Sequence, residues 1–304
     1  MPPAITDFHV HYVGPRWHTG VLRSLPHLPD SAARITDIAD VLAPIQAGQF
    51  QSRVLSAPVS MVFGTAAVDP EEIRLINDHL ASVVAQHTEA LIGLATIDLW
   101  NPAATQEIQR VADLGFTGVV VDAAQMNTGT FAHDPQILPA WRALRDSRLT
   151  VFFHPVSLPA VTAAFAGTSR AGVLLARGAV DAGSLLALLD APQWDELHDL
   201  QLVVPGIAAS ALWFAPFFDG LDSTLLGPKG RGIHLDTMGF DPANTRYLLE
   251  RLGAERLVFG SDAPIVDKQP DATRLLSHLN SAGLHGAALA AVAGGNAERL
   301  LRRT

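Results

Sequence analysis

Five side chains that could bind a metal ion or move a proton lie in three apolar stretches of the sequence. They are Asp7, His9 and His11 in DFHVH, His154 in TVFFHP and Asp262 in LVFGSDAP. Imidazole nitrogens and carboxylate oxygens suit Zn²⁺, with Mn²⁺ and Fe²⁺ as alternative occupants. Each residue also has an ordinary explanation, because a histidine can fill a strand and an aspartate after Gly-Ser can cap a turn. Metal binding requires that the fold bring these side chains together.

Eight short aliphatic or β-branched runs are the elements that would position these residues. We expect strands over Ile5–His11, Arg53–Val59, Leu91–Asp98, Phe116–Asp122, Thr150–His154, Gln201–Pro205, Ile233–Asp236 and Leu257–Gly260. Helix signals follow these runs, such as Asp69-Pro70-Glu71-Glu72 at the start of a stretch that ends at His87. Eight strand–helix alternations are typical of an α/β fold of the (β/α)₈ TIM-barrel type. A doubly wound sheet would need a glycine-rich turn after its first strand, and none is present.

The barrel interpretation predicts where the candidate ligands point. Alternation along the first strand puts Asp7, His9 and His11 on one face, toward the barrel interior, and Phe8 on the other face, toward the helices. The remaining two candidates end the fifth and eighth strands. Active sites of TIM barrels lie at the C-terminal ends of the strands, so all of these groups are expected at one rim.

Composition limits the protein's environment and partners. Apolar residues make up 48% of the 304 residues and charged residues 17%, which favours one domain over residues 1–304 with a large core. The formal charge of −9 and the lack of basic runs disfavour nucleic acid or anionic membranes as partners. There is no cysteine for a thiolate ligand or nucleophile, and residues 1–13 show no signal peptide. We therefore expect a cytoplasmic protein that acts on a small molecule.

Spaced motifs along nearly the whole chain resemble those of the amidohydrolase superfamily. The chain is most similar to the amidohydrolase-related branch, which includes aminocarboxymuconate-semialdehyde decarboxylase. The motifs are DFHVH at 7–11, FHP at 153–155, HLDT at 234–237, FGSDAP at 259–264 and GNAERL at 295–300. By this resemblance His9, His11, His154 and Asp262 would hold one divalent ion, with zinc expected first and manganese second. Members of the branch are commonly homodimers, so the resemblance also implies a homodimer.

The lysine content agrees with a single ion. Binuclear members of the superfamily bridge two ions through a carbamylated lysine at the end of the fourth strand. Here the fourth strand ends in Val121-Asp122-Ala123-Ala124, and the only two lysines of the chain, Lys229 and Lys268, lie far from it in sequence.

Two groups usual in the decarboxylase branch are missing from the sequence. The branch carries a histidine after its sixth strand, and this position falls on Gly206 in LVVPGIAA. It also carries a substrate-binding arginine a few residues later, where this chain has Asp219-Gly220-Leu221-Asp222. Because no histidine or arginine lies between Gln201 and Leu226, these groups are absent or come from another segment or subunit.

Three functions remain open from the sequence. The leading hypothesis is a metal-dependent hydrolase of a small, carboxylated ester, lactone or amide, in which Asp262 is the base for a metal-activated water. The alternative is a non-oxidative, metal-dependent decarboxylase of an aromatic or muconate-like acid, with His234 as a possible substitute for the missing histidine. The third is a barrel that binds a metal or ligand without catalysis.

Further residues receive weaker assignments. Arg16 and Arg53 could each clamp a substrate carboxylate, or could be surface arginines. Asp7 and Ser261 are expected to orient the ligands. The apolar cluster from Trp213 to Phe218 could form an interface, a lid or a pocket wall. Two long connections, Gly14–Gln51 and Val156–Leu200, leave strands one and five at the rim and are candidate lids or dimer surfaces.

Overall fold

The predicted strands all form in the structure, which is a computed structural model. It describes residues 3–165, 167–168, 170–197, 199–217, 232–238, 241–266 and 271–302. The segment Asp219–Asp222 and both lysines, Lys229 and Lys268, lie outside the described residues. The strands are β1 (Thr6–His11), β2 (Ser52–Ser56), β3 (Leu91–Gly93), β4 (Ala95–Thr96), β5 (Gly118–Asp122), β6 (Thr150–His154), β7 (Leu202–Val204), β8 (Ile233–Asp236) and β9 (Leu257–Val258).

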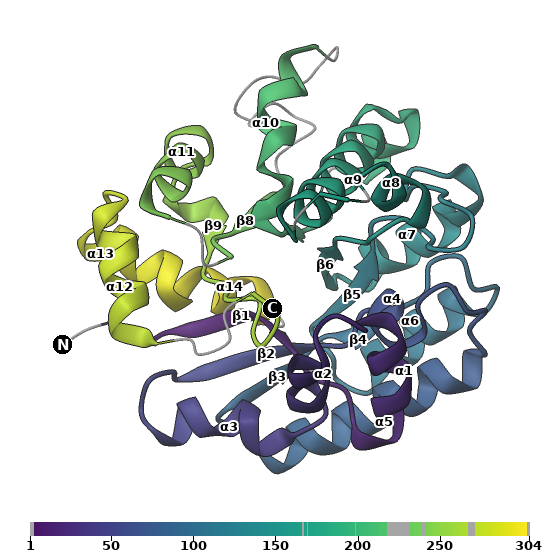
Figure 1. Cartoon of the computed structure of the whole chain (residues 1–304), viewed down its shortest axis with the longest axis horizontal. Helices are drawn as coiled ribbons and strands as arrows, with labels where there is room; N and C mark the ends of the chain where they lie inside the picture. Colours follow the sequence, from purple (N-terminus) through teal and green to yellow (C-terminus); the bar gives the residue numbers. More distant parts are fainter. Residues whose placement is uncertain are drawn as a thin grey trace.

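The strands close into a single parallel barrel. Two hydrogen-bonded sheets, β1-β2-β3 and β4-β5-β6-β7-β8-β9, run in sequence order, and β3 and β4 are the two halves of the predicted third strand. The Leu94 N–H between these halves donates to Leu55 O of β2. At the other seam, the Phe8 N–H donates to Phe259 O and the His11 N–H donates to Ala263 O. The TIM-barrel prediction is confirmed, and Figure 1 shows the ring of helices around the strands.

The helices follow the strands as the caps predict. In chain order the α-helices are α1 (His18–Ser24), α2 (Pro29–Ile35), α3 (Ile38–Gln46), α4 (Val59–Phe63), α5 (Pro70–Gln86), α6 (Ala104–Asp113), α7 (Leu138–Asp146), α8 (Pro159–Ala164), α9 (Arg170–Asp190), α10 (Ala211–Phe214), α11 (Pro242–Leu252), α12 (Ala272–Ser281), α13 (Gly286–Ala290) and α14 (Asn296–Leu301). The Asp69 side chain accepts the Glu71 N–H at the start of α5, and Asp241 caps α11 in the same way. A short 3₁₀ helix, η4 (Gly206–Ser210), directly follows β7.

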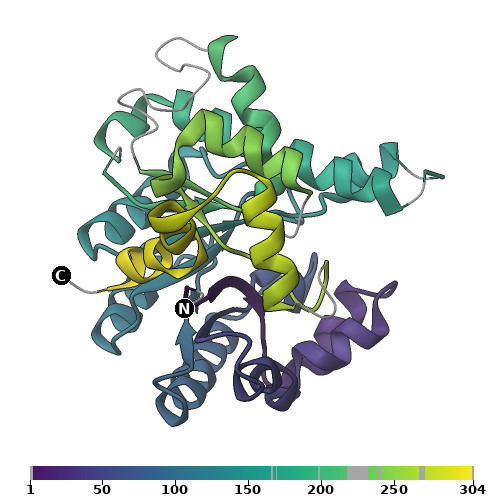
Figure 2. The same ribbon diagram turned by 90° about the vertical axis from the view of Figure 1, so that its left-hand side faces the viewer.

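The barrel interior is filled by one apolar layer below the rim. Its buried side chains come from the strands and from α14, and they are Phe8, Val54, Leu94, Val120, Phe152, Val203, Val258, Ala297, Leu300 and Leu301. Figure 2 shows the yellow C-terminal helices beside the start of β1. Helix α14 therefore closes the end of the barrel opposite the rim.

The predicted orientation of two β1 residues is wrong. Phe8 packs inside the barrel with Phe152, and Asp7 pairs with Arg53 next to Phe50, which belongs to the layer between barrel and helices. The register of β1 against β2 shifts between Asp7 and Val10, so strict alternation fails in this strand.

Helix α9 is the longest element of the described chain and covers one side of the rim. By length and hydropathy alone, Ala171–Asp190 is the one described stretch that could cross a membrane, but 61% of its apolar 18-residue window is buried in the protein. Its apolar sequence is interrupted by Arg177 and Asp181. Both features are those of a core helix packed on a barrel.

Candidate metal centre

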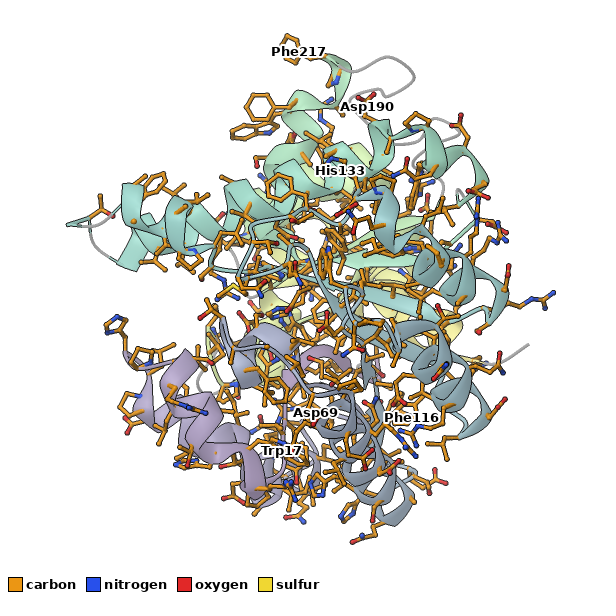
Figure 3. The ribbon with its side chains drawn as sticks, turned by 90° about the vertical axis from the view of Figure 1, so that its right-hand side faces the viewer. Trp17, Asp69, Phe116, His133, Asp190 and Phe217 are labelled. Atoms are coloured by element: carbon orange, nitrogen blue, oxygen red, sulfur yellow. The ribbon has the colours of Figure 1, made fainter. Side chains whose placement is uncertain are left out.

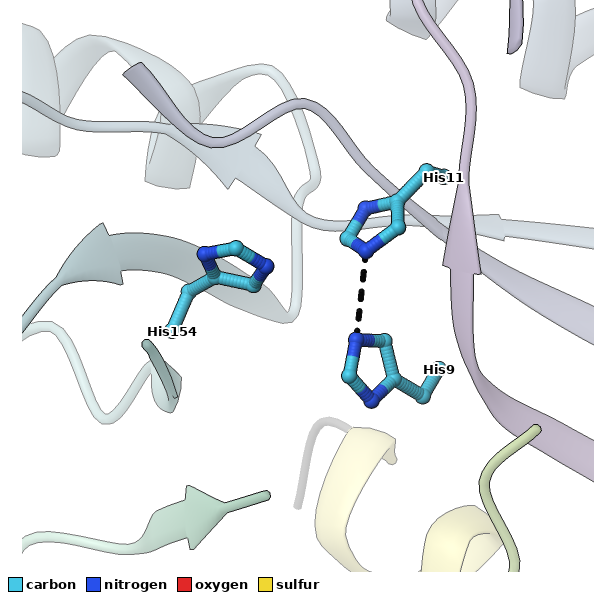
Figure 4. A group of neighbouring side chains, drawn as sticks. All are labelled: His9, His11 and His154. Atoms are coloured by element: carbon cyan, nitrogen blue, oxygen red, sulfur yellow. Dashed lines mark hydrogen bonds between the residues drawn. The ribbon is translucent and has the colours of Figure 1, made fainter. Parts of the chain in front are cut away.

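The three histidines predicted as ligands meet at the rim of the barrel. Ligand nitrogens of His9, His11 and His154 all lie within 4.8 Å of one another, and the three side chains are buried. His9 Nε2 and His11 Nε2 are 3.2 Å apart. Figure 4 shows these two rings on β1 facing each other, with His154 approaching from β6.

Asp262 completes the group from the loop after β9. Its Oδ1 lies 3.0 Å from His11 Nε2 and 3.4 Å from His9 Nε2. Ligand atoms bound at about 2.1 Å to one ion lie about 3.0–3.4 Å from one another, so His9, His11 and Asp262 have the spacing of ligands to one small divalent ion, with His154 beside them. The Asp262 backbone adopts φ +52°, a conformation that costs a non-glycine residue of order 1–3 kcal/mol and that clusters at functional sites.

Hydrogen bonds at Nδ1 of His9 and His11 orient the Nε2 atoms of these two rings toward Asp262. His9 Nδ1 donates to Asp236 Oδ2 at 2.7 Å. The Ser56 hydroxyl donates to Val10 O, so its oxygen is free to accept from His11 Nδ1 at 3.2 Å. When both Nδ1 atoms carry the ring proton, both Nε2 atoms present lone pairs. These two nitrogens and the Asp262 oxygen are then three acceptors that face one another, and a bound cation would satisfy all of them.

The charge state of the group agrees with this arrangement. Burial alone would lower the pKa of His9, but the carboxylates of Asp262 and Asp236 outweigh it and raise that pKa. Burial lowers the pKa of His11, and that of His154 falls well below its usual value. Burial would raise the pKa of Asp262, but His9 and His11 hold it below its usual value. Without an ion, the proton on His9 supplies the positive charge that the converging lone pairs require.

Sequence reasoning missed Asp236 as a part of this site. Besides His9, the Asp236 carboxylate accepts the Gly206 N–H at 2.8 Å, so it joins β8 to the position where a histidine was expected. The signal was available, because Asp236 ends the seventh predicted strand at the rim and lies two residues after His234, on the same face.

Asp122 at the end of β5 is a second group that the sequence did not single out. Its Oδ1 lies 3.8 Å from His154 Nδ1, which is buried and has no hydrogen-bond partner. Ser60 holds the carboxylate through its N–H and its hydroxyl at 2.7 and 2.9 Å. Burial raises the pKa of Asp122 to about 7. The group can therefore hold or release a proton near neutral pH.

Asp7 and Ser261 contact each other rather than the ligands. The Ser261 N–H and hydroxyl donate to the two Asp7 oxygens at 3.0 and 2.7 Å, and Arg53 Nη2 lies 3.4 Å from Asp7 Oδ2. These bonds hold the backbone immediately before Asp262 against β1. Asp7 and Ser261 therefore position the ligand Asp262 through its backbone and do not contact its side chain. Arg53 is buried in this contact and does not face the histidines.

The structure does not bring Arg16 or His234 to the ligands. Arg16 is mostly exposed and pairs with Glu72 at 2.8 Å. His234 points into the barrel, but it is in register with Val203 and Phe152, one layer below His154. Its Nδ1 lies 3.1 Å from Gly232 O, and burial lowers its pKa to about 4.

Two cavities flank the centre. One, of about 180 Å³, is lined by Asp98, Trp100, Asp122 and Gln125 among others. The other, of about 700 Å³, is mainly apolar and lies between α9, η4 and α11, with Gly206, Met238 and Trp213 in its wall. Gly206, the position of the expected histidine, is thus part of the wall of this cavity. Trp213 is therefore a pocket wall, one of the three roles considered for its cluster.

Comparisons with known proteins agree with the geometry. The profile of the amidohydrolase family matches residues 6–303. A 2-amino-3-carboxymuconate-6-semialdehyde decarboxylase from Dictyostelium discoideum is 30% identical over 108 residues, which cover 34% of this chain and only 29% of that protein. Similar solved structures include 5-carboxyvanillate decarboxylase from Sphingomonas paucimobilis, with 23% identity, 99% coverage of both chains and a TM-score of 0.82. Another is a dihydroxybenzoic acid decarboxylase from Polaromonas with bound manganese, with 20% identity, 99% and 97% coverage and a TM-score of 0.79.

Proposed function

Because the chain belongs to the amidohydrolase family, we propose that it is a metal-dependent decarboxylase of a small aromatic or muconate-like acid. The observation that supports this most is the buried cluster of His9, His11 and His154, with the Asp262 carboxylate 3.0 Å from His11. The relatives named above are decarboxylases, so they favour the alternative drawn from the sequence over the hydrolase that led there.

The proposed ligands are His9, His11, His154 and Asp262, and the proposed ion is Mn²⁺ rather than the expected zinc, because a similar structure holds manganese. When bound, the ion would hold substrate oxygens and draw electron density from the acid as a Lewis acid. The protein's own groups would orient the acid, exclude water and move one proton to the carbon that loses carbon dioxide. We assign this transfer to Asp262, which is ionised in the folded protein and would therefore first take up a proton from water and then pass it to that carbon. His234, one layer below, has no part in this scheme.

The test is carbon dioxide release by manganese-loaded protein from a panel of acids that includes 2,6-dihydroxybenzoate and 5-carboxyvanillate. We expect turnover that disappears on metal removal with a chelator and returns with Mn²⁺. The variant His9→Ala/His11→Ala should lose about one equivalent of metal and all activity. A metal-loaded wild type that releases no carbon dioxide but cleaves esters, lactones or amides would replace this proposal with the hydrolase.

A homodimer, which the family resemblance implied, is part of the same proposal. Three aromatic side chains near η4 are unusually exposed, namely Trp213, Phe214 and Phe217, with Phe217 83% exposed. Figure 3 shows Phe217 at the far end of its segment, away from the barrel. Large exposed apolar side chains of this kind gather at protein interfaces. Light scattering after gel filtration should give twice the chain mass, and Phe217→Ser should shift the protein toward monomer.

A further inference from the structure

Arg177 lies on the side of α9 that faces the metal centre. Its Nη2 donates to Pro155 O at 3.2 Å, and Pro155 directly follows the ligand His154. The neighbouring face of the helix, with Leu174 and Gly178, lines the apolar cavity. Helix α9 thus places the Arg177 guanidinium beside the metal centre and lines the neighbouring apolar cavity.

The positive charge of Arg177 reaches the groups of the site. Burial is the largest influence on the pKa values of His11, His154, Asp122 and Asp262. The charge of Arg177 is a further influence on all four, and in each case it disfavours the protonated form. Because Arg177 Nη2 also contacts Pro155 O, next to the ligand His154, the guanidinium lies beside the metal centre, where it can act on a bound anion.

Among the described residues no carboxylate forms an ion pair with Arg177, although Asp181, one turn further along α9, feels its charge. Arg177 Nε is buried and makes no hydrogen bond. Asp181, one helical turn further, is also buried, and neither of its oxygens has a hydrogen-bond partner. Burial raises the pKa of Asp181 well above its usual value, which favours its neutral form. A buried donor on a cation without an acceptor is costly, unless a ligand supplies the acceptor.

The position of Arg177 depends on close packing of α9 against η4. A Cβ atom built on Gly178 would lie 2.8 Å from Ile207 O, so only glycine permits this approach. Ile207 belongs to the same short helix as Gly206, where the expected histidine is missing. The rim is therefore closed on this side by α9, and Arg177 is the basic side chain that α9 turns toward the ligands.

We propose that Arg177 is the substrate-binding residue that holds the carboxylate of the acid beside the metal centre. This inference rests on the proposed function, because it assumes an acid substrate. A guanidinium binds a carboxylate through two parallel N–H···O bonds, which fixes its orientation as well as its charge. The arginine expected after the sixth predicted strand, which is β7 in the structure, is absent from the sequence. Helix α9 supplies an arginine from the connection before β7.

The test compares an acid with its neutral amide. Calorimetry on manganese-loaded protein would measure binding of 2,6-dihydroxybenzoate and of 2,6-dihydroxybenzamide to the wild type, Arg177→Gln, Arg177→Lys and Arg142→Gln. We expect Arg177→Gln to bind the acid about 10- to 100-fold more weakly and the amide unchanged. Arg177→Lys should recover part of the acid affinity, since it keeps the charge but not the two parallel bonds. Arg142, which pairs with Glu196 on the exposed face of α7, is the matched control and should match the wild type.

Metal content and circular dichroism of each variant would show that the site remains folded. Equal affinity of Arg177→Gln and wild type for the acid would overturn the inference and leave the proposed decarboxylase intact. An equal loss of acid and amide affinity would also overturn it, because it would show a structural role for Arg177. A metal-loaded wild type that binds none of the acids would overturn the proposed function and this inference with it.

Discussion

The carboxylate of Asp236 joins the ligand His9 on β1 to the backbone of Gly206, which follows β7. Its Oδ2 accepts from His9 Nδ1 at 2.7 Å and its Oδ1 accepts the Gly206 N–H at 2.8 Å. The first bond fixes the ring so that Nε2 points at the metal, and the second fixes the carboxylate itself. The group that orients a ligand is thus held by the same short helix against which α9 packs.

Asp236→Asn is expected to weaken metal binding. An amide oxygen is a poorer acceptor for the His9 Nδ1–H than a carboxylate, and loss of such a partner typically costs about 10- to 100-fold in metal affinity. Competition with a chromogenic chelator would measure the manganese affinity of the variant. Asp113→Asn, on the exposed face of α6, is the control and should behave as the wild type. Unchanged affinity in Asp236→Asn would show that the ring is held by its packing alone.

Arg53→Met is expected to cost stability rather than substrate affinity. Arg53 and Asp7 are both buried, and without the guanidinium Asp7 would lose a charged partner, at a cost of about 1–3 kcal/mol in the free energy of unfolding. Urea denaturation would measure this loss. The double variant Arg53→Met/Asp7→Asn should regain part of it, because the buried charge is then removed. A higher KM for the acid with unchanged stability would instead restore Arg53 as a substrate clamp.

The sequence was most informative where a strand pattern alone decides the structure. All eight strands and the rim positions of His9, His11, His154 and Asp262 follow from apolar runs and from the rule that barrel sites lie at C-terminal strand ends. The orientations of Asp7 and Phe8 were predicted wrongly. A register shift between two paired strands cannot be detected from the residue spacing within one of them.

Arg177 could not be assigned from the sequence for a different reason. The direction in which the Arg177 side chain points depends on the orientation of α9 about its own axis. That orientation is set by contact with η4, about thirty residues later in the chain. The helix pattern of this segment is apolar nearly all round, so periodicity does not say which face turns to the barrel.

Gly178→Ala is expected to disturb the same contact. The added methyl group would lie 2.8 Å from Ile207 O, which must move, at a cost of about 1–3 kcal/mol. Because α9 would shift away from the rim, KM for the acid should rise while the metal content stays the same. Gly183→Ala is the control on the same helix, since its Cβ would lie 3.8 Å from the nearest atom, in Phe131. Similar stability and KM in both variants would show that α9 tolerates a methyl group at either position.

His234 is expected to make the metal-free protein less stable in mild acid. Burial is the largest cause of the drop of its pKa from 6.5 to about 4, so the unfolded chain binds a proton between these values and the folded chain does not. The stabilisation from neutral His234 is complete above pH 6.5 and is lost as the pH falls through 4. Between pH 7 and pH 5 this loss amounts to about 2 kcal/mol of the free energy of unfolding.

Urea denaturation of metal-free wild type and His234→Gln at both pH values would isolate this effect. Glutamine takes up no proton in this range, so the variant, whatever its stability at pH 7, should lose about 2 kcal/mol less than the wild type on going to pH 5. Metal-free protein is used because protons compete with the ion for the ligand histidines. Equal losses in the two proteins would mean that His234 takes up its proton in the folded state, and that the layer below the ligands admits water.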